Sequence, residues 1–305
     1  MQRRTFLQKV TAASSLMAMG ALPAEAFYGA EELTRITIMH TNDMHSRIEP
    51  FSLDGTKYEG RGGAARRAAL INKVRAEVEH TLLLDAGDIF QGTPYFNLFG
   101  GELEFKLMSK MGYDAATFGN HDFDGGIEGF EKQLPYANFP FVISNYDFRN
   151  TILNDKTKEY LILEKGGMKI GITGVGIELK GMVLQSLYKE TQYLDPIKSA
   201  NRVAKFLKKE MDCDYVICLS HLGFKYDDGK VSDHDLAAQS GDIDMILGGH
   251  THTFLEAPVI IENKRKKPVI INQAGWAGIV LGRLDLVFER NKKNKCVTCQ
   301  NQLIG

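Results

Sequence analysis

The sequence predicts a mixed α/β fold in which β-sheets pack face to face and helices cover the outside. Strand and helix signals alternate in the first half of the chain, and strands follow closely on one another in the second half. Short clusters of polar residues stand at the ends of the apolar runs. The 305 residues, 44% of them hydrophobic, suit one large globular domain or two small ones, and one domain is the simplest interpretation.

The first half of the chain alternates apolar runs with amphipathic segments. The apolar runs are expected to form buried strands, and they cover residues 36–40, 81–85, 114–118 and 139–144. Between them, apolar residues at helical spacing predict helices, over residues 64–78, 102–111 and 126–134. Gly112 is expected to end the second of these helices.

The second half of the chain is richer in strand signals. Gly166 and Gly167 separate two β-rich runs and predict a hairpin. An amphipathic helix is expected over residues 196–211, because Asp195 and Pro196 provide a capped start. The strands expected after it, with no helix between them, cover residues 215–219, 243–247, 259–261, 269–272 and 279–288. This spacing predicts that the chain ends as a meander.

The first 26 residues are expected to be an export signal, which leaves residues 27–305 as the folded domain. Arg3 and Arg4 precede Thr-Phe-Leu and a stretch of small and apolar residues, as in twin-arginine signals. Cleavage is expected after Ala26, and an ordinary secretory signal is the alternative. The apolar stretch is too short and too interrupted for a stable membrane anchor. We therefore expect a periplasmic or extracellular protein.

The net charge indicates which partners are expected, and the cysteines indicate whether a zinc ribbon is expected. The net charge of −1 gives no overall field to attract nucleic acid, so no nucleic-acid partner is expected. Cys213 and Cys218 lie in or beside a predicted strand and are expected to be packed side chains. Cys296 and Cys299 form a single C-x-x-C, which is expected to be structural or incidental because a zinc ribbon needs a second pair.

Five clusters of potential metal ligands stand at the ends of the apolar runs. They contain five of the eight histidines in the chain. The clusters are Asp43-Met44-His45, Gly87-Asp88, Gly119-Asn120-His121-Asp122, Ser220-His221 and Gly248-Gly249-His250-Thr251-His252. Carboxylate, amide and imidazole groups suit divalent ions such as Zn, Mn, Fe or Co. The clusters therefore predict a site for two metal ions at the C-terminal edge of a sheet.

The spacing within the clusters suggests how the side chains converge. Asp43 and His45 are two residues apart, as are His250 and His252, and alternation along an extended segment places such pairs on one side. The neighbouring glycines are expected to let the backbone turn sharply near an ion. Asp88 is the best candidate for a carboxylate that bridges two cations, about 3.5–4 Å apart. Such a pair activates a water by lowering its pKa to about 7.

His121 is expected to act on the substrate rather than bind metal. It directly follows Asn120, so alternation would turn its ring away from the ion. Asp124 lies three residues on and could orient and charge the imidazole, which could then stabilise phosphoryl oxygens or protonate a leaving group. The alternative is that Asp124 only caps the helix that begins near Gly125.

Beyond these patterns, the chain resembles the calcineurin-like metallophosphoesterases, and more narrowly the catalytic domain of the 5′-nucleotidase and 2′,3′-cyclic phosphodiesterase family. The resemblance extends from Arg35 to Phe288. It rests on segments Ile-Met-His-Thr-Asn-Asp-Met-His (38–45), Leu-Asp-Ala-Gly-Asp (84–88), Phe-Gly-Asn-His-Asp-Phe-Asp (118–124), Ser-His-Leu-Gly (220–223) and Gly-Gly-His-Thr-His (248–252).

The resemblance implies a four-layer αββα sandwich and a role for each site residue. One metal would be bound by Asp43, His45, Asp88 and His252. The other would be bound by Asp88, Asn120, His221 and His250. His121 and Asp124 would form the catalytic dyad. The expected function is hydrolysis of small phosphomonoesters, 5′-nucleotides among them, by metal-activated water.

Two departures from the family pattern bear on this expectation. Asp122 stands where many members have Glu, and both are acidic. Nucleotidases of the family also carry a C-terminal substrate-binding domain, whereas this sequence ends at Gly305. The alternatives are a 2′,3′-cyclic nucleotide phosphodiesterase, a catalytic subunit served by a separate substrate-binding chain, and a metal-binding accessory protein without catalysis.

Overall fold

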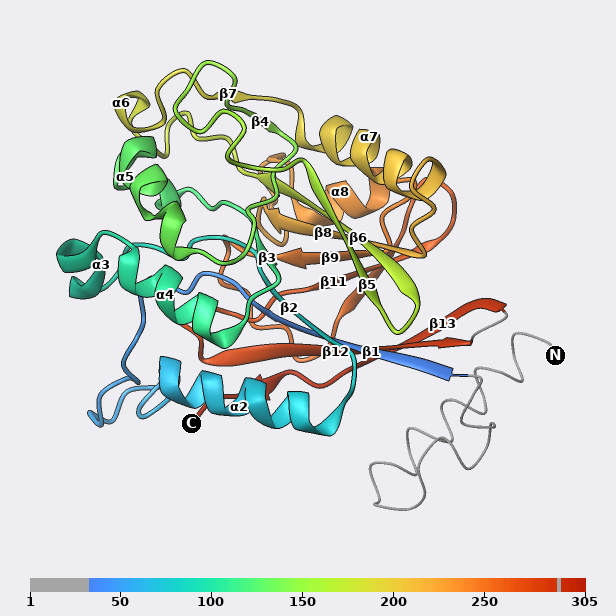
Figure 1. Cartoon of the computed structure of the whole chain (residues 1–305), viewed down its shortest axis with the longest axis horizontal. Helices are drawn as coiled ribbons and strands as arrows, with labels where there is room; N and C mark the ends of the chain where they lie inside the picture. Colours follow the sequence, from blue (N-terminus) through green and yellow to red (C-terminus); the bar gives the residue numbers. More distant parts are fainter. Residues whose placement is uncertain (1–32, 290–291) are drawn as a thin grey trace.

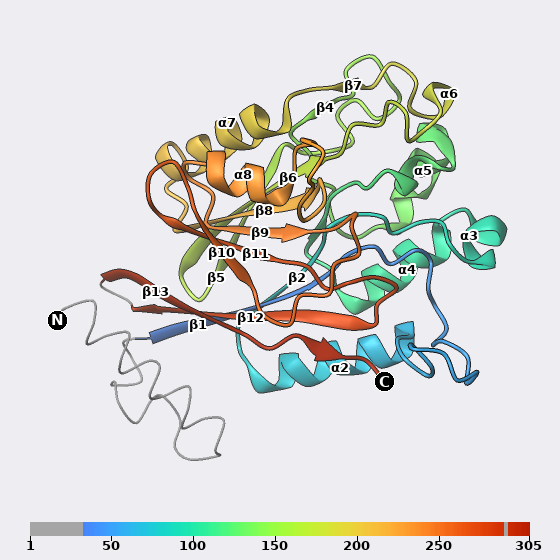
Figure 2. The ribbon, with the colours of Figure 1, turned by 180° about the vertical axis from the view of Figure 1, so that it is seen from behind.

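Two β-sheets lie face to face at the centre of the molecule, with helices on both outer sides (Figures 1 and 2). The computed structural model describes residues 33–289 and 292–305, with the side chains of 289–297 left out. The predicted export signal therefore lies outside the described residues. Within the described part, no helix is both long and apolar enough to cross a lipid bilayer.

The first sheet has the order β13-β12-β1-β2-β3, and β14 also pairs with β12. Its strands are β1 (Leu33–Thr41), β2 (Thr81–Asp85), β3 (Ala115–Ala116), β12 (Val280–Glu289), β13 (Lys292–Cys299) and β14 (Gln302–Leu303). Strands β1, β2 and β3 are parallel, and β12 is antiparallel to β1. The carboxyl ends of the three parallel strands therefore share one edge.

The second sheet has the order β10-β11-β9-β8-β6-β5. Its strands are β5 (Tyr160–Lys165), β6 (Met168–Gly176), β8 (Tyr215–His221), β9 (Met245–Gly248), β10 (Val259–Glu262) and β11 (Pro268–Asn272). The central four are parallel, and β5 and β10 form antiparallel edges. The β5–β6 turn uses Gly166 and Gly167 at φ 56° and 74°, which confirms the predicted hairpin.

Helices complete the predicted four-layer αββα arrangement. The first sheet is covered by α2 (Ala64–Glu77), α4 (Glu102–Met111) and α5 (Gly126–Gln133), and the second by α7 (Pro196–Lys209) and α8 (Asp233–Gln239). Smaller elements are α3 (Pro94–Phe99), α6 (Gln185–Tyr188), the 3-10 helices η2 (His121–Phe123) and η3 (Leu134–Tyr136), and the paired strands β4 (Tyr146–Asp147) and β7 (Gln192–Tyr193).

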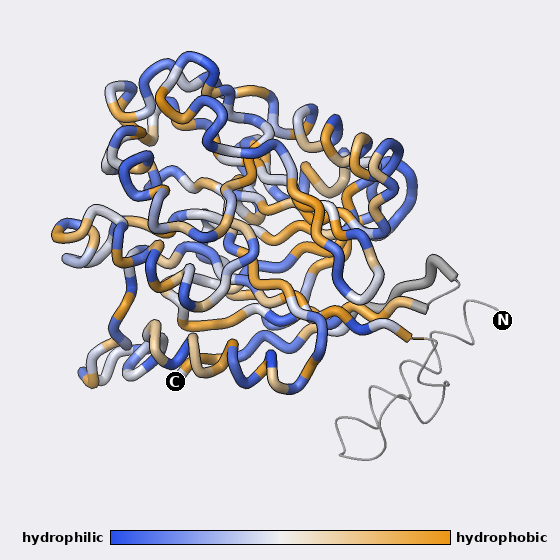
Figure 3. Tube along the Cα trace, in the orientation of Figure 1, coloured by the Kyte–Doolittle hydropathy of each residue, from blue (hydrophilic) through white to orange (hydrophobic). Residues whose placement is uncertain are grey.

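Alternating side chains divide the apolar residues among three core layers. In β1, Ile36 and Ile38 point between the sheets, whereas Met39 packs under the helices of the first sheet. In β8, Ile217 faces the inter-sheet layer and Val216 faces α7 and α8. The strands at the centre are accordingly the most hydrophobic part of the trace (Figure 3). Burial on both faces holds the strand ends in fixed positions.

Three predictions about elements need correction. Residues 139–144 form only isolated bridges, at Phe141 and Val142, because Pro140 has no N–H to donate to a ladder. A helix, α8, does lie between two of the late strands, β8 and β9, and it begins with a capping box formed by Ser232 and Asp235. The chain does not end as a meander, because β11 is parallel to β9 and β12 crosses to the first sheet.

The cysteines behave as expected where they are described. Cys213 and Cys218 are buried and free, and Cys299 is also free. The side chain of Cys296 lies outside the described residues. The expectation for the C-x-x-C motif therefore stays a prediction.

Ile217 and Ile260 offer a matched test of the inter-sheet core. Ile217 is fully buried between the sheets, whereas Ile260, on edge strand β10, is 64% exposed. Ile217→Ala should lower the free energy of unfolding by about 2–5 kcal/mol, since it leaves a cavity. Ile260→Ala should lower it by less than about 1 kcal/mol. Chemical denaturation measures both, and equal losses would contradict this description of the core.

Candidate active site

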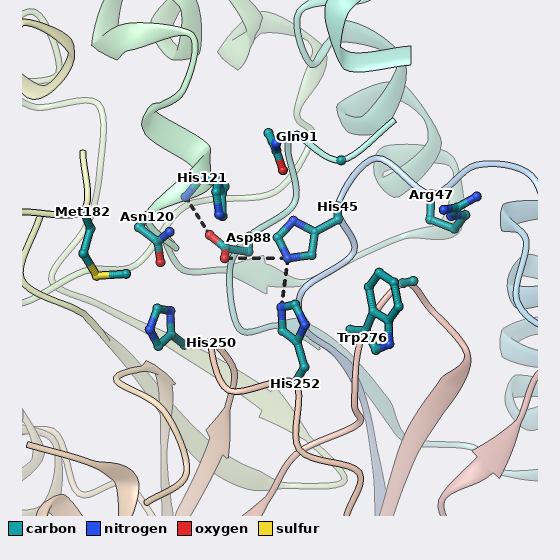
Figure 4. A pocket seen from close by; sticks show the side chains of 12 residues that line it. His45, Arg47, Asp88, Gln91, Asn120, His121, Met182, His250, His252 and Trp276 are labelled. Atoms are coloured by element: carbon teal, nitrogen blue, oxygen red, sulfur yellow. Dashed lines mark hydrogen bonds and ion pairs between the residues drawn. The ribbon is translucent and has the colours of Figure 1, made fainter. Parts of the chain in front are cut away.

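The five polar clusters converge where parallel strands of both sheets end. Asp43 follows β1, Asp88 follows β2, His221 is the last residue of β8, and His250 follows β9. Figure 4 shows Asp88, His45, His250 and His252 turned toward one another. The predicted convergence at a sheet edge is therefore confirmed, with one addition: the residues come from both sheets.

The converging side chains form two groups that could each hold an ion. In each group the ligand atoms lie within 4.8 Å of one another. The first group is Asp43, His45 and His252, and the second is Asp88, His221 and His250. The Oδ2 atom of Asp88 lies 3.1 Å from His221 Nε2 and 3.9 Å from His45 Nε2, so its carboxylate adjoins both groups.

Several atoms in these groups are placed as metal ligands would be. His45 Nε2 and His252 Nε2 face each other at 3.0 Å, and in a hydrogen bond only one of them can carry the proton. The Oδ1 atom of Asn120 is buried and has no hydrogen-bond partner among the described residues. Lone pairs that converge without donors fit a cation. Asn120 also lines the cavity that residues of both groups line.

Burial and charge set the protonation of the imidazoles. Burial lowers the pKa of His45 and lowers that of His250 to about 4, which favours the neutral ring that metal ligation requires. Burial opposes the charged form of His221 as well, but Asp88 and then Asp43 raise its pKa to about 10. The other ring nitrogen, His221 Nδ1, donates to the Ala86 carbonyl at 2.7 Å and so aims Nε2 at Asp88.

The backbone reaches this arrangement through left-handed conformations. Positive φ angles between 48° and 74° occur at Asp43, His45, Asp88, His250 and His252. The expectation that extended alternation aligns these pairs is therefore wrong, although the side chains do converge. Such conformations cost of order 1–3 kcal/mol each and persist where surrounding bonds impose them.

Hydrogen bonds between the loops impose these conformations. The N–H of His250 donates to both oxygens of Asp43 at 3.0 Å. The N–H of Asp43 donates to the Gly87 carbonyl at 2.9 Å, and that of His45 to the Asp88 carbonyl at 3.0 Å. Gly87 itself has φ 89°, as the predicted sharp turn requires.

Asp122 is an organising residue to which the sequence analysis gave no role. Its buried carboxylate accepts four backbone N–H groups. The donors are Gly119 and Asp88 to Oδ2, at 2.8 and 3.1 Å, and Ile89 and Phe90 to Oδ1, at 3.0 and 3.2 Å. It therefore ties the loop of Asp88 to the loop of Asn120. An acidic residue directly after His121 was the only available signal, and it does not reveal which amides it binds.

His121 and Asp124 form a hydrogen-bonded pair at the edge of the site. His121 Nδ1 lies 2.8 Å from Asp124 Oδ2, and this bond raises the pKa of the imidazole. Among the described residues no side chain makes a capping hydrogen bond to the start of α5, so the capping alternative for Asp124 does not hold. His121 begins the 3-10 helix η2 rather than an extended segment, so helical geometry, and not strand alternation, sets its direction.

A cavity of about 370 Å³ opens above the two groups. Besides the predicted residues, its lining includes Arg47, Gln91, Met182 and Trp276, which sequence reasoning did not single out. Trp276 lies in the loop between β11 and β12. By contrast, His40 lies outside the site: it is fully buried, accepts a hydrogen bond from Asn272 at 2.9 Å, and burial lowers its pKa to about 3.

Comparison with known proteins assigns this arrangement to a family. Residues 36–254 match the family described as Calcineurin-like phosphoesterase. The chain belongs to the calcineurin-like phosphoesterases. This phosphoesterase is 33% identical over 322 residues to 5′-nucleotidase from Vibrio cholerae, covering 96% of this chain and 56% of that protein.

Two further relatives support the same assignment. The trifunctional nucleotide phosphoesterase protein YfkN from Bacillus subtilis is 33% identical over 286 residues, covering 83% of this chain and 18% of that protein. The structure of a 5′-nucleotidase precursor from Thermus thermophilus superposes with a TM-score of 0.80 at 31% identity, covering 89% of this chain and 55% of that one. The chain thus spans about half the length of the nucleotidases it matches, and less of YfkN.

Family membership and geometry agree on the chemistry. The phosphoesterase is a metal-dependent phosphoester hydrolase, and its family uses two divalent metal ions. The structure provides two candidate groups for them. The predicted family, enzyme class and two-metal requirement are therefore confirmed.

Gly119 gives a test of how closely the loops must approach. A Cβ atom at Gly119 would lie 2.1 Å from Asp88 Oδ1, whereas one at Gly129, inside α5, would meet nothing within 4 Å. Gly119→Ala should displace Asp88 and lower metal affinity and kcat/KM by about 10- to 100-fold. Gly129→Ala should leave both unchanged and raise stability by about 0.5–1 kcal/mol. Metal analysis, kinetics and denaturation check the pair, and full activity of Gly119→Ala would contradict the described contact.

Proposed function

We propose that this chain is an exported phosphomonoesterase that hydrolyses 5′-nucleotides. The observation that carries the proposal is the cavity itself. Residues of both potential metal groups line it, and so does His121 of the His121–Asp124 pair. The relatives named as 5′-nucleotidases support the nucleotide as substrate.

The proposed ligand sets follow the two groups and add Asn120. One ion would be bound by Asp43, His45, Asp88 and His252, and the other by Asp88, Asn120, His221 and His250. Zn, Mn, Fe or Co suits these donors. When bound, the ions would lower the pKa of a water and offset the charge that builds up on the phosphoryl oxygens.

His121 is the proposed proton donor. Because Asp124 accepts the proton on Nδ1, the second nitrogen, Nε2, is left for the substrate. Because the hydrogen bond to Asp124 raises the pKa of His121, the imidazole keeps its proton at a higher pH than a free histidine does. The imidazolium can then stabilise a phosphoryl oxygen or protonate the departing alkoxide.

Export is the remaining part of the proposal. It rests on Arg3, Arg4 and the apolar stretch up to Ala26, all outside the described residues. The names of the relatives include snake venom 5′-nucleotidase, which accords with a protein that leaves the cell. Fractionation of cells expressing the full chain, with an Arg3→Lys/Arg4→Lys control, tests this. Retention of the wild-type protein in the cytoplasm would contradict export.

A substrate panel tests the nucleotide proposal. Metal-reconstituted protein should hydrolyse 5′-nucleotides faster than 2′,3′-cyclic nucleotides and other phosphomonoesters. A preference for the cyclic substrates would favour the phosphodiesterase alternative. High nucleotidase activity of this chain alone would count against a separate substrate-binding chain. Absence of hydrolysis across the panel, with both metals bound, would support the accessory-protein alternative.

Two substitutions separate metal binding from proton donation. Asp88→Asn should abolish activity and reduce the content of both metals, because Asp88 adjoins both groups. His121→Ala should lower kcat by about 10²–10⁴-fold and retain both metals. Elemental analysis and kinetics on the same preparations measure these effects. Loss of metal from His121→Ala would mean that this histidine is a ligand.

A further inference from the structure

Trp276 is the only tryptophan in the chain and lines the active-site cavity. Its indole lies parallel to the His252 imidazole, at an interplanar angle of 3° and a centroid distance of 5.6 Å. Phe51 and Tyr58 contact the indole in T-shaped geometry, at 5.7 and 6.1 Å. Three rings therefore hold the indole in one orientation beside the first metal group.

Arg47 adds a cation to the same wall of the cavity. Its guanidinium lies 4.2 Å from the centroid of the Phe51 ring. None of the described carboxylates forms an ion pair with it, and its Nε atom is buried without a hydrogen-bond partner. In the close view Arg47 and Trp276 are drawn on the same side of the clustered histidines (Figure 4). The wall thus offers an aromatic ring and a guanidinium that no described acidic group neutralises.

The opposite side of the cavity has a different character. Met182 stands across the metal-ligand residues from Trp276 (Figure 4) and is 48% exposed. A flexible thioether provides apolar contact but no fixed planar surface. The side with Trp276 and Arg47 therefore offers a fixed planar surface that Met182 does not.

We infer that Trp276 and Arg47 form a subsite for a planar aromatic group on the alcohol side of the phosphate ester. Aromatic side chains and arginine both stack on the π-faces of nucleobases. The indole packs directly against the ring of His252, a proposed metal ligand. A group joined to a bound phosphoryl group through roughly one sugar ring would therefore reach the indole. Resting on the proposed function, the inference assigns the nucleobase to this wall of the catalytic domain.

Two substrates with the same leaving alkoxide test the subsite. Adenosine 5′-monophosphate and ribose 5-phosphate both release a primary 5′-alcohol and differ in the base. Trp276→Ala should reduce the ratio of their kcat/KM values by about tenfold, the effect of losing one base–aromatic stack. Arg47→Met, which keeps the aliphatic stem, should reduce the ratio by about threefold.

Two control variants separate substrate contact from support of His252. Trp276→Phe retains a ring and should keep most of the ratio. Phe254→Leu removes a ring outside the cavity, one that stacks on Tyr58 at 5.9 Å, and should leave the ratio unchanged. Equal losses for both substrates in Trp276→Ala, with reduced metal content, would show that the indole only positions His252. An unchanged ratio would also overturn the inference.

The fluorescence of the single tryptophan gives a readout independent of turnover. In metal-loaded His121→Ala protein, where hydrolysis is expected to be slow, adenosine 5′-monophosphate should quench the emission of Trp276 saturably. Ribose 5-phosphate should quench it less than one-fifth as much. Equal quenching by the two ligands, or none by either, would contradict contact between base and indole.

A second substrate pair distinguishes failure of the subsite from failure of the proposed function. 2-Phenylethyl phosphate and propyl phosphate share a primary alkoxide and differ in the ring. If nucleotides are not hydrolysed but preference for the phenyl ester depends on Trp276, the nucleotidase proposal fails and the subsite stands. If nucleotides are hydrolysed rapidly and neither ratio responds to Trp276→Ala, the subsite fails and the proposed function stands. If no ester is cleaved, the quenching experiment alone decides.

Discussion

The carboxylate of Asp88 is the interaction on which the site depends. One oxygen accepts the N–H of His121 at 2.8 Å, and the other lies 3.1 Å from His221 Nε2. Burial would normally keep such a group protonated, yet the neighbouring histidines, His221 foremost, lower its pKa below the usual range. A buried negative charge at this point attracts cations and imidazoles alike. It also fixes the loop that carries the proposed proton donor.

Much of the remaining architecture serves to hold that carboxylate in place. Asp122 accepts the backbone N–H groups of Asp88 and Gly119, and Gly119 lets the neighbouring backbone approach to a distance that no side chain would allow. The left-handed residues store strain that the two-sheet core can support, because β1, β2 and β8 end at the buried residues Thr41, Asp85 and His221. The free energy gained by packing the core therefore offsets the strain that holds the site residues in position.

From the sequence, the helices, the strands and the residues of the site were predicted more accurately than the local geometry of the site. Apolar periodicity identified α2, α4, α7 and most strands, because burial on a defined face repeats every few residues. The short α8 was missed, since seven residues give too little periodicity, although Ser232 and Asp235 signal its start. The pairing of Asp122 with backbone amides leaves no trace in composition. The contribution of Trp276 depends on which loops meet in space, and short sequence patterns carry no information about that.

Each potential metal group draws its residues from both sheets: Asp43 and His45 follow β1 while His252 follows β9, and Asp88 follows β2 while His221 ends β8. Ions bound by these groups would cross-link two layers that touch mainly through apolar side chains. Metal affinity and the packing between the sheets would then be thermodynamically linked. Loosening a core residue between the sheets would weaken ion binding, and ion binding would in turn stabilise that core.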